Sequence, residues 1–283
     1  MTWLGVGLLV VALAALAYWQ LIIAEGAYLG PRVVAWTYDL IASRYDGIKR
    51  FEPRDEGWFV AGPVLHGLQG VERPLVLDVA TGTGRLPLAL LRERFGATGG
   101  RIVGLDLSPG MLCRARAKLQ PYGDQVALVR QDASHLPFDD GIFDAVTCLE
   151  SLEFMPRPLE VLAEMVRVLA PGGVLFLTNR VGHEARLLPG RAIPRPEFER
   201  VLAALPLRET TVRRWQVNYD LAVARKVGQR PSARPGSGGS DVLVHCPACA
   251  GPLQRGVASL TCPACERSYP VHEGFVDLTG LKR

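Results

Sequence analysis

The chain has 283 residues, of which 48% are hydrophobic and 21% are charged. This is enough apolar material for one full-sized core and a smaller unit, and it excludes a disordered protein. The formal net charge of +4 is a small surplus that an ordinary solvated surface accounts for, although a membrane surface or RNA would also suit it. Six cysteines are spread too unevenly for a disulfide scaffold, since four form two close pairs near the C-terminus, which points to metal binding and a reducing compartment.

The first segment is apolar. Leu4 to Ile23 contains no charged residue, and Gln20 is its only strongly polar one. Twenty helical residues at 1.5 Å each span roughly 30 Å, the thickness of a hydrocarbon core. A secretory signal peptide would start with basic residues, and Met1 to Trp3 contain none. We therefore expect residues 1–25 to form a retained transmembrane anchor rather than a cleaved signal or a buried core helix.

The residues that flank this segment predict its orientation. Tyr18 and Trp19 lie near its C-terminal end, where amphipathic rings suit the headgroup layer. The cations that follow keep the body of the protein in the cytoplasm by the positive-inside rule, with the short N-terminus outside. These cations are Arg32, Arg44, Lys49, Arg50 and Arg54.

Residues 26–74 are expected to form a helical cap. Pro31 to Phe51 carries apolar residues at roughly helical spacing, at Val33, Val34, Trp36, Leu40, Ile41 and Tyr45. This pattern favours a helix packed on the domain. The alternative is an interfacial membrane helix, because the segment follows the anchor directly.

Residues 75–227 alternate β and α signals. Strand-like runs occur at "PLVLDV", "RIVGLD", "VALVRQD", "FDAVTCL" and "GGVLFLTN", and helix-like segments follow the first, second and fourth. Ser108 is a suitable N-cap, with Pro109 at the first helical position. The alternation predicts an α/β domain with a parallel sheet. "ERVLAAL" could add a helix, and "LRETTVRRWQ" with "YDLAVARKV" predicts a closing hairpin at the sheet edge.

A glycine-containing loop follows the first strand. Gly82 and Gly84 lie between a predicted strand and a predicted helix, where backbone N–H groups can approach a ligand. Ala80 stands where a dinucleotide fingerprint has its first glycine. Asp106 ends the second strand, 22 residues after Gly84, where a carboxylate can accept both ribose hydroxyls. No Lys-Ser or Lys-Thr pair follows the loop, which disfavours a P-loop, but an NAD-dependent dehydrogenase remains open at this point.

Four segments together resemble the class I S-adenosylmethionine-dependent methyltransferases, over roughly Asp39 to Val227. They are "LDVATGTG", "GLDLSPGML", "QDASHLPFDDGIFDAVTC" and "VLAPGGVLFLTN". The resemblance implies a Rossmann-like, seven-stranded sheet with an antiparallel final strand. "YDLIASRYD", Tyr38 to Asp46, also resembles the N-terminal segment that closes over the site in small-molecule and quinone methyltransferases.

The same resemblance implies a binding mode for S-adenosylmethionine. The methionine part would be met by the loop of Ala80, Gly82 and Gly84 together with Asp78. The ribose would be met by Asp106 and its neighbour Leu107. Asp132 with Ala133 would meet the adenine, with the aspartate accepting from the exocyclic amine, which favours this cofactor over NAD. Ala80 departs from the usual glycine.

Methyl transfer from a sulfonium is an in-line displacement, so the enzyme aligns the nucleophile and removes a proton where one must leave. "CLESLEFM", Cys148 to Met155, follows the fourth strand and is expected to face the methyl group. Glu150 and Glu153 could serve there as a base or hold a cationic amine, and His135 is a further catalytic candidate. The alternative is that one or both of these glutamates face solvent and take no part in the chemistry. The segment lacks the Asn-Pro-Pro-Tyr-type motif of amide and adenine N-methyltransferases, which disfavours such substrates.

A flexible linker, residues 228–241, precedes a cysteine module at residues 242–283. "CPAC" occurs twice, with Cys246 and Cys249 separated by twelve residues from Cys262 and Cys265. Two such knuckles present four thiolates tetrahedrally, as structural zinc requires. The module resembles the zinc-ribbon family whose best-known member activates several tRNA, rRNA and release-factor methyltransferases. Cys113 and Cys148 are expected to be small buried residues.

The sequence therefore predicts a membrane-anchored methyltransferase that faces the cytoplasm. The anchor favours a lipophilic small-molecule acceptor, such as a quinone, an isoprenoid or a phospholipid headgroup. One alternative is an RNA or protein methyltransferase that uses the ribbon to present its substrate. The other is a non-catalytic scaffold tethered to the membrane.

Overall fold

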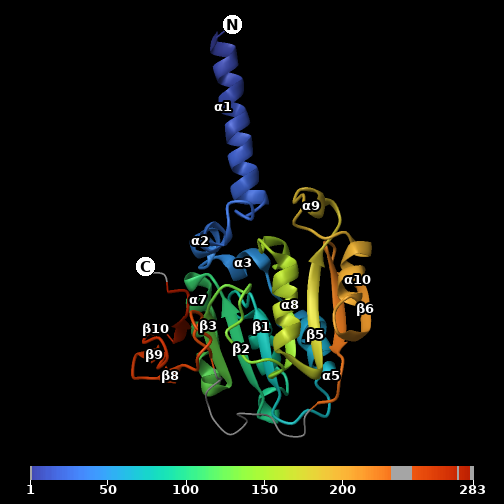
Figure 1. The fold of residues 1–283 in the computed structure, drawn as a ribbon. Coiled ribbons are helices and arrows are strands. Elements are labelled where there is room, and N and C mark those ends of the chain that lie inside the picture. The colour runs from blue at the N-terminus through green and yellow to red at the C-terminus, as the bar shows by residue number, and fades with distance from the viewer. Residues whose placement is uncertain (1, 231–243, 273, 281–283) are drawn as a thin grey trace.

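The computed structural model describes residues 2–230, 244–272 and 274–280. The linker expected at residues 228–241 lies mostly outside the described residues, as do the first two residues of the expected ribbon. Helix α1 (Thr2–Tyr18) continues as the short π-helix η1 (Trp19–Ile23) and projects alone from the body of the protein (Figure 1). Trp3–Ile23 has a mean hydropathy of 2.3 and is long and apolar enough to cross a membrane. A signal sequence would have the same features, so retention of the anchor stays a prediction.

Short helices connect this segment to the sheet. The helix expected over residues 31–51 is divided into α2 (Pro31–Ile41) and α3 (Tyr45–Lys49). They are followed by α4 (Pro53–Glu56), η2 (Gly57–Ala61) and α5 (Gly62–Gly67). Helix α2 packs against α7 (Pro109–Leu119), which confirms that this segment packs on the domain.

The central sheet confirms the α/β prediction. Its first seven strands lie in the order β6-β7-β5-β4-β1-β2-β3. Strand β7 pairs antiparallel with both β5 and β6, and the other pairs among these strands are parallel. The strands are β1 (Leu75–Val79), β2 (Arg101–Asp106), β3 (Val126–Arg130), β4 (Phe143–Cys148), β5 (Leu169–Arg180), β6 (Leu207–Trp215) and β7 (Tyr219–Lys226). The last two form the expected hairpin.

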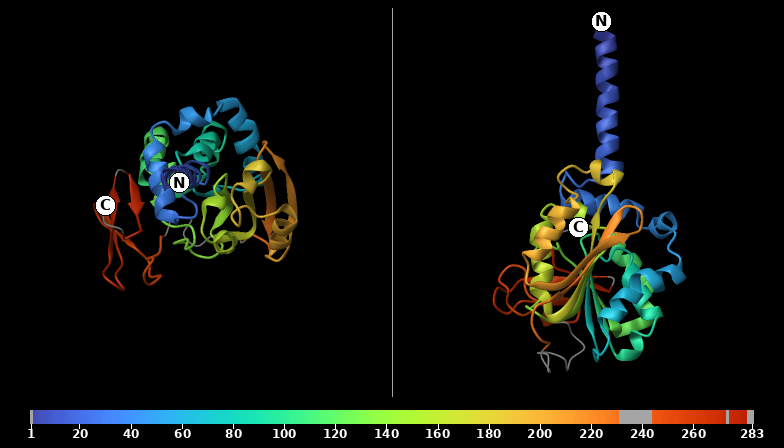
Figure 2. Two further views of the ribbon diagram at one scale, coloured as in Figure 1. Left: turned by 90° about the horizontal axis from the view of Figure 1, so that it is seen from above. Right: turned by 90° about the vertical axis from the view of Figure 1, so that its right-hand side faces the viewer.

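In the described residues, four strands of the cysteine module extend the seven strands of this sheet to eleven. Strand β11 (Phe275–Asp277) pairs in parallel with β3, with Val276 opposite Val129 and Asp277 opposite Arg130. Beyond it lie β10 (Ser268–His272), β9 (Ser259–Thr261) and β8 (Gln254–Arg255). An edge strand presents unpaired backbone groups, and β11 satisfies those of β3. The module and the β6–β7 hairpin lie at opposite edges of the sheet (Figure 2, left).

Helices cover both faces of the sheet, which is why β4 is buried along all six residues. One apolar cluster joins α5, α6 (Arg85–Arg92) and α7 to the sheet, and another joins α8 (Pro158–Val168) and α10 (Arg195–Ala203) to the opposite face. Ser108 caps α7 as expected, since its hydroxyl accepts a 3.1 Å hydrogen bond from the Met111 amide. The remaining short helices are η3 (Gly96–Thr98), η4 (Gln120–Gln125), η5 (Leu152–Phe154) and α9 (His183–Arg186).

Candidate functional site

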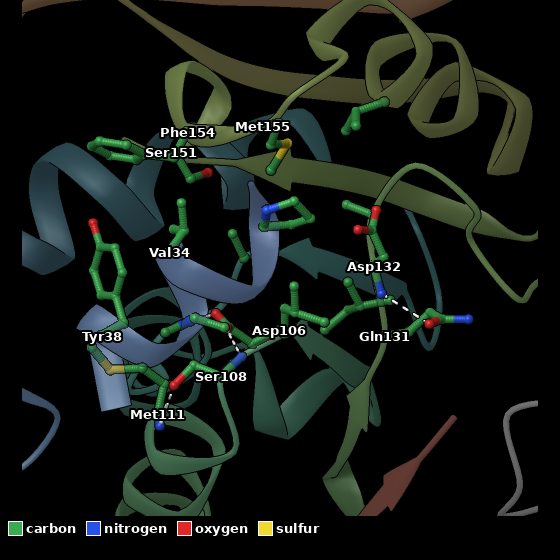
Figure 3. A pocket seen from close by; sticks show the side chains of 18 of the residues that line it. Val34, Tyr38, Asp106, Ser108, Met111, Gln131, Asp132, Ser151, Phe154 and Met155 are labelled. Atoms are coloured by element: carbon green, nitrogen blue, oxygen red, sulfur yellow. Dashed lines mark hydrogen bonds between the residues drawn. The ribbon is translucent and has the colours of Figure 1, made fainter. Parts of the chain in front are cut away.

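A cavity of about 380 Å³ lies at the carboxyl ends of β1, β2 and β4, beneath α2 (Figure 3). Its size is within the range of small-molecule sites. The strand order reverses at β1, which is flanked by β2 and β4, and ligands of open α/β sheets bind at such switch points. Asp106, Asp132 and Tyr38 come from three different elements and lie around the same space.

The loop between β1 and α6 has an unusual backbone. Ala80, Gly82 and Gly84 all have positive φ, at 56°, 55° and 78°. Glycine adopts this conformation without strain, whereas a residue with a Cβ loses roughly 1–2 kcal/mol. A Cβ at Gly84 would also lie 2.9 Å from the Leu119 side chain. Ala80 and Gly82 line the cavity as predicted, and Gly84 lies at the N-terminus of α6, outside the lining.

Asp106 lies on the cavity wall beside this loop, and Leu107 follows it along the wall. Its two carboxylate oxygens accept hydrogen bonds from the amides of Gly82 at 2.8 Å and Ser108 at 2.9 Å. Burial raises the pKa of Asp106, and the two amides oppose that shift. The geometry thus brings together the predicted loop and the predicted ribose acid.

Asp78 lies beneath the loop, outside the cavity lining. Its carboxylate accepts hydrogen bonds of 2.7 Å from the hydroxyls of both Thr81 and Thr147. Burial raises the pKa of Asp78 to about 6. Asp78 was expected to meet the methionine part of the cofactor. Its carboxylate instead connects the loop to β4 and does not line the cavity.

The predicted adenine side of the cavity is formed by the segment after β3. Asp132 and Ala133 both line the wall. Asp132 Oδ1 accepts hydrogen bonds from the Ser134 amide at 2.8 Å and from its hydroxyl at 2.5 Å, so the carboxylate is held in one orientation. The Asp132 amide donates to the Gln131 side chain at 2.9 Å.

Glu150 reaches the cavity from the turn after β4. Its φ is 54°, and its amide donates a 2.6 Å hydrogen bond to the Thr178 hydroxyl. Its carboxylate is ion-paired with Lys49 at 3.1 Å and Arg85 at 2.5 Å. Burial acts to raise the pKa of Glu150, but the two cations outweigh it and hold the pKa below its ordinary value. Glu150 is therefore a stable anion and a weak base.

The structure does not bring the other two predicted catalytic side chains to the wall of this cavity. Glu153 is buried on η5, where it accepts from Arg180 at 2.6 Å and from the Tyr219 hydroxyl at 2.7 Å. The turn at Glu150 directs η5 toward β5 and β7, which explains this placement. His135 is exposed to solvent and lies outside the lining.

The roof of the cavity contains residues to which the sequence analysis gave no chemical role. Tyr38, Tyr45 and Phe154 line it, and the Tyr38 hydroxyl donates a 2.5 Å hydrogen bond to Glu25. Burial raises the pKa of Glu25, so this carboxyl holds its proton to higher pH than an exposed one. The only sequence signal for Glu25 is that it is the first acid after the apolar segment.

Asp39 connects α2, in the roof, to the start of α7, beside the floor. Its Oδ1 accepts from the Ser108 hydroxyl at 2.5 Å and from the Gly110 amide at 2.8 Å. A Cβ at Gly110 would lie 2.8 Å from the same oxygen, so glycine permits the close approach of α2 to α7.

The four cysteines of the C-terminal module form one cluster, with all four sulfurs within 4.8 Å of one another. Cys246 and Cys265 are 3.6 Å apart, and Cys249 and Cys262 are 3.4 Å apart. Tetrahedral zinc with thiolates at about 2.3 Å requires sulfur separations of about 3.8 Å, so the cluster fits this metal. Cys148 is buried, and burial raises its pKa to about 12, which leaves it a neutral thiol at pH 7.

Comparison with known proteins agrees with this geometry. Residues 77–177 match the family model of a methyltransferase domain, and residues 243–274 match that of Trm112p-like protein. The chain has the class I methyltransferase fold. The loop after β1, Asp106 after β2 and Asp132 after β3 therefore lie at the carboxyl ends of the strands of this fold.

One curated relative is the demethylmenaquinone methyltransferase of Thermus thermophilus, which is 47% identical over 102 residues. The match covers 36% of this chain and 45% of the relative. The chain spans about half the length of the curated relatives it matches.

Two solved structures share the fold of the methyltransferase domain. The [4+2]-cyclase SpnF has a TM-score of 0.58 at 20% identity and covers 70% of this chain and 97% of its own. A SAM-dependent methyltransferase from Aquifex aeolicus has a TM-score of 0.53 at 21% identity and covers 67% and 98%. Since the first of these is called a cyclase, the fold alone does not define the reaction.

Proposed function

We propose that the protein transfers a methyl group from S-adenosylmethionine to a lipophilic small molecule of the quinone class. The observation that carries this proposal is the two-sided cavity, with a polar floor at the strand ends and an aromatic, apolar roof on α2 and η5. The floor suits a nucleoside, and the roof suits a flat apolar acceptor.

S-adenosylmethionine, when bound, supplies an electrophilic methyl group on a sulfonium. Asp106 would accept from the ribose hydroxyls, because it lines the cavity and each of its oxygens, which accepts from one loop amide, has a second lone pair. Asp132 would accept from the exocyclic amine of adenine, with its orientation fixed by Ser134. Ala80 and Gly82 would bring the backbone close to the methionine part.

The names of the curated relatives support a quinone acceptor. In the reduced form of such an acceptor, a ring carbon would form the new bond to the methyl group as the carbon–sulfur bond breaks, and the displaced ring proton would pass to solvent water. Tyr38 lines the roof and donates to Glu25 behind it, so this pair is suited to orient a phenolic hydroxyl. Glu150 also lines the cavity, where its ion pairs with Lys49 and Arg85 tie α3 and α6 to the turn after β4.

The proposed place of the reaction is the cytoplasmic face of a membrane. Trp3–Ile23 would span the bilayer, and the basic residues that follow it favour a cytoplasmic body. This arrangement places the domain at the surface where lipophilic acceptors reside.

The proposed metal is one structural zinc ion per chain, held by Cys246, Cys249, Cys262 and Cys265. We expect metal analysis of the purified chain to return one zinc, and Cys262→Ser to lose it. Cys113→Ser is the matched control and should retain the metal. A chain purified without zinc and with the C-terminal strands still folded would contradict this assignment.

The function is tested by incubating the full chain in lipid nanodiscs with methyl-labelled S-adenosylmethionine and a whole-cell extract, followed by solvent partition. Label in the organic phase, on a reduced quinone, is the expected result. Label in RNA or protein would instead support the alternative in which the ribbon presents a macromolecule, although the described ribbon residues do not line the cavity. No binding of the cofactor would indicate a scaffold.

A further inference from the structure

Helix α2 has two faces with different surroundings. Val34, Ala35 and Tyr38 line the cavity on the inner face. On the outer face, Arg32, Trp36 and Leu40 follow one another at helical i, i+4 spacing. Trp36 is 53% exposed and Leu40 is 62% exposed, so the helix presents two large apolar side chains away from the domain. A helix bounded by water on that side would carry polar residues there.

Helix α2, which carries this outer face, follows the proposed membrane span closely in the chain. Eight Cα–Cα steps separate Ile23 from Pro31, which is roughly 29 Å at full extension. The connection is compact, because Ala24 and Ala27 are both fully buried. Helix α1 therefore leaves the domain from the end on which α2 and α3 lie (Figures 1 and 2).

Contacts with the loop after β5 fix this junction. The Trp19 indole donates to the Leu187 carbonyl at 3.0 Å, and the Tyr28 hydroxyl donates to the Pro189 carbonyl at 2.8 Å. Arg191 donates to the Ala27 carbonyl at 2.7 Å. Because the junction is attached to the domain at several points, a membrane that holds α1 also determines which end of the domain faces the lipid.

Charge is distributed unevenly around α2 and α3. The two acids of these helices have partners on the domain, since Asp39 bonds to Ser108 and Gly110, and Asp46 pairs with Lys118 at 2.8 Å. Arg32, Arg44 and Arg50 are exposed. Exposed cations together with exposed Trp and Leu match an interfacial helix on an anionic bilayer.

We propose that the outer face of α2, centred on Trp36 and Leu40, lies in the headgroup layer of an anionic bilayer. Its inner face meanwhile forms the roof of the acceptor cavity. This inference deepens the proposed function and rests on it for the identity of the acceptor. A bilayer-bound roof would place the cavity next to the phase in which a quinone is dissolved.

The depth of Trp36 can be measured without any methyl transfer. The full chain is labelled with 5-fluorotryptophan and reconstituted in nanodiscs of phosphatidylcholine and phosphatidylglycerol, and the Trp36 resonance is assigned with Trp36→Phe. Relaxation is then compared between a doxyl-labelled lipid and a water-soluble gadolinium chelate. Val257→Trp is the control position, because Val257 is fully exposed between β8 and β9, and these strands lie away from α1 (Figure 1).

We expect the doxyl lipid to relax the Trp36 signal at least about threefold more than the Val257→Trp signal, and the chelate to show the reverse order, as shallow insertion predicts. Equal access of the chelate to both positions would overturn the proposal, whatever reaction the protein performs. If Trp36 is embedded but no quinone is methylated, the docking stands and the acceptor is wrong.

A second experiment tests the consequence for substrate entry. Trp36→Ser combined with Leu40→Ser is compared with Val257→Ser in the same nanodiscs. For a bilayer-dissolved quinone we expect KM to rise by about tenfold in the double variant, with kcat retained, and for a water-soluble short-chain quinone we expect no change in KM. An equal loss on both acceptors would indicate a damaged fold and would contradict a role in entry.

Discussion

The floor and the roof of the cavity are built in different ways. On the floor, Asp106, Gly82 and Ser108 are positioned by the end of one strand and the loops beside it. On the roof, the Tyr38 side chain donates to the Glu25 carboxylate, and Lys49 donates to the Glu150 carboxylate, 101 residues away in the sequence. The comparison teaches that the cofactor half of the site is positioned by backbone amides at the strand ends, whereas the acceptor half depends on ion pairs and hydrogen bonds between side chains.

The largest effect on stability is expected from removing the charge of Arg85, which pairs with two carboxylates. Arg85 pairs with Glu56 at 2.6 Å and with Glu150, and its side chain is only 16% exposed. Arg85→Met keeps an apolar stem against Phe51 but leaves both carboxylates without this partner. We expect the free energy of unfolding to fall by about 3 kcal/mol in urea denaturation. Arg92→Met, at an exposed position on the same helix, should change it little.

The pH dependence of the free energy of unfolding of Arg85→Met gives a second test of the Arg85–Glu150 ion pair. Because the folded-state pKa of Glu150 is lowered, its stabilising contribution is present above the ordinary glutamate pKa and is lost as pH falls through the folded value. In Arg85→Met the pKa of Glu150 should move back toward its ordinary value, so the variant should lose less stability than the parent as pH falls below the ordinary glutamate pKa. Identical acid unfolding of the two proteins would contradict the ion pair.

Asp106→Ala should damage the floor alone. Loss of charged hydrogen bonds worth about 2 kcal/mol corresponds to an increase of about thirtyfold in the Kd of S-adenosylmethionine. Isothermal titration calorimetry checks this, with Glu199→Ala on the exposed side of α10 as the control. An unchanged Kd would show that the cofactor lies elsewhere.

Glu25→Gln should act on the roof. The amide oxygen can still accept from Tyr38, but position 25 no longer titrates. We expect kcat/KM for the quinone to fall by about tenfold, as loss of a proton-holding group predicts, with the Kd of the cofactor retained. The raised pKa of Glu25 means that its proton is lost only above the ordinary glutamate pKa, so this limb of the pH–rate profile should disappear in the variant. Glu52→Gln, at an exposed residue, should keep the profile.

The smallest effect on stability is expected from Ala80→Gly, because Ala80 has a positive φ that glycine adopts without strain. Ala80→Gly relieves a left-handed alanine but loosens the unfolded chain, and these contributions nearly cancel. The net gain in stability should be about 0.5 kcal/mol by thermal unfolding. A loss of stability would mean that the Ala80 methyl makes a favourable contact.

The sequence predicted the elements that follow local rules. The strand alternation, the Ser108 cap, the β6–β7 hairpin and the grouping of four cysteines follow from spacing and backbone preference. The placement of Glu153 and the edge pairing could not be obtained in this way. Glu153 is held away from the cavity by Arg180 and Tyr219, and β11 pairs with a strand 147 positions earlier at Asp277 and Arg130. Both depend on contacts between segments that are distant in the sequence.

The pairing of β11 with β3 has a consequence for assembly. Because both strands belong to one chain, their association is a unimolecular step whose equilibrium does not depend on protein concentration. Dilution that would separate two independent subunits leaves this edge closed. Every copy of the methyltransferase domain therefore carries one cysteine module at fixed stoichiometry.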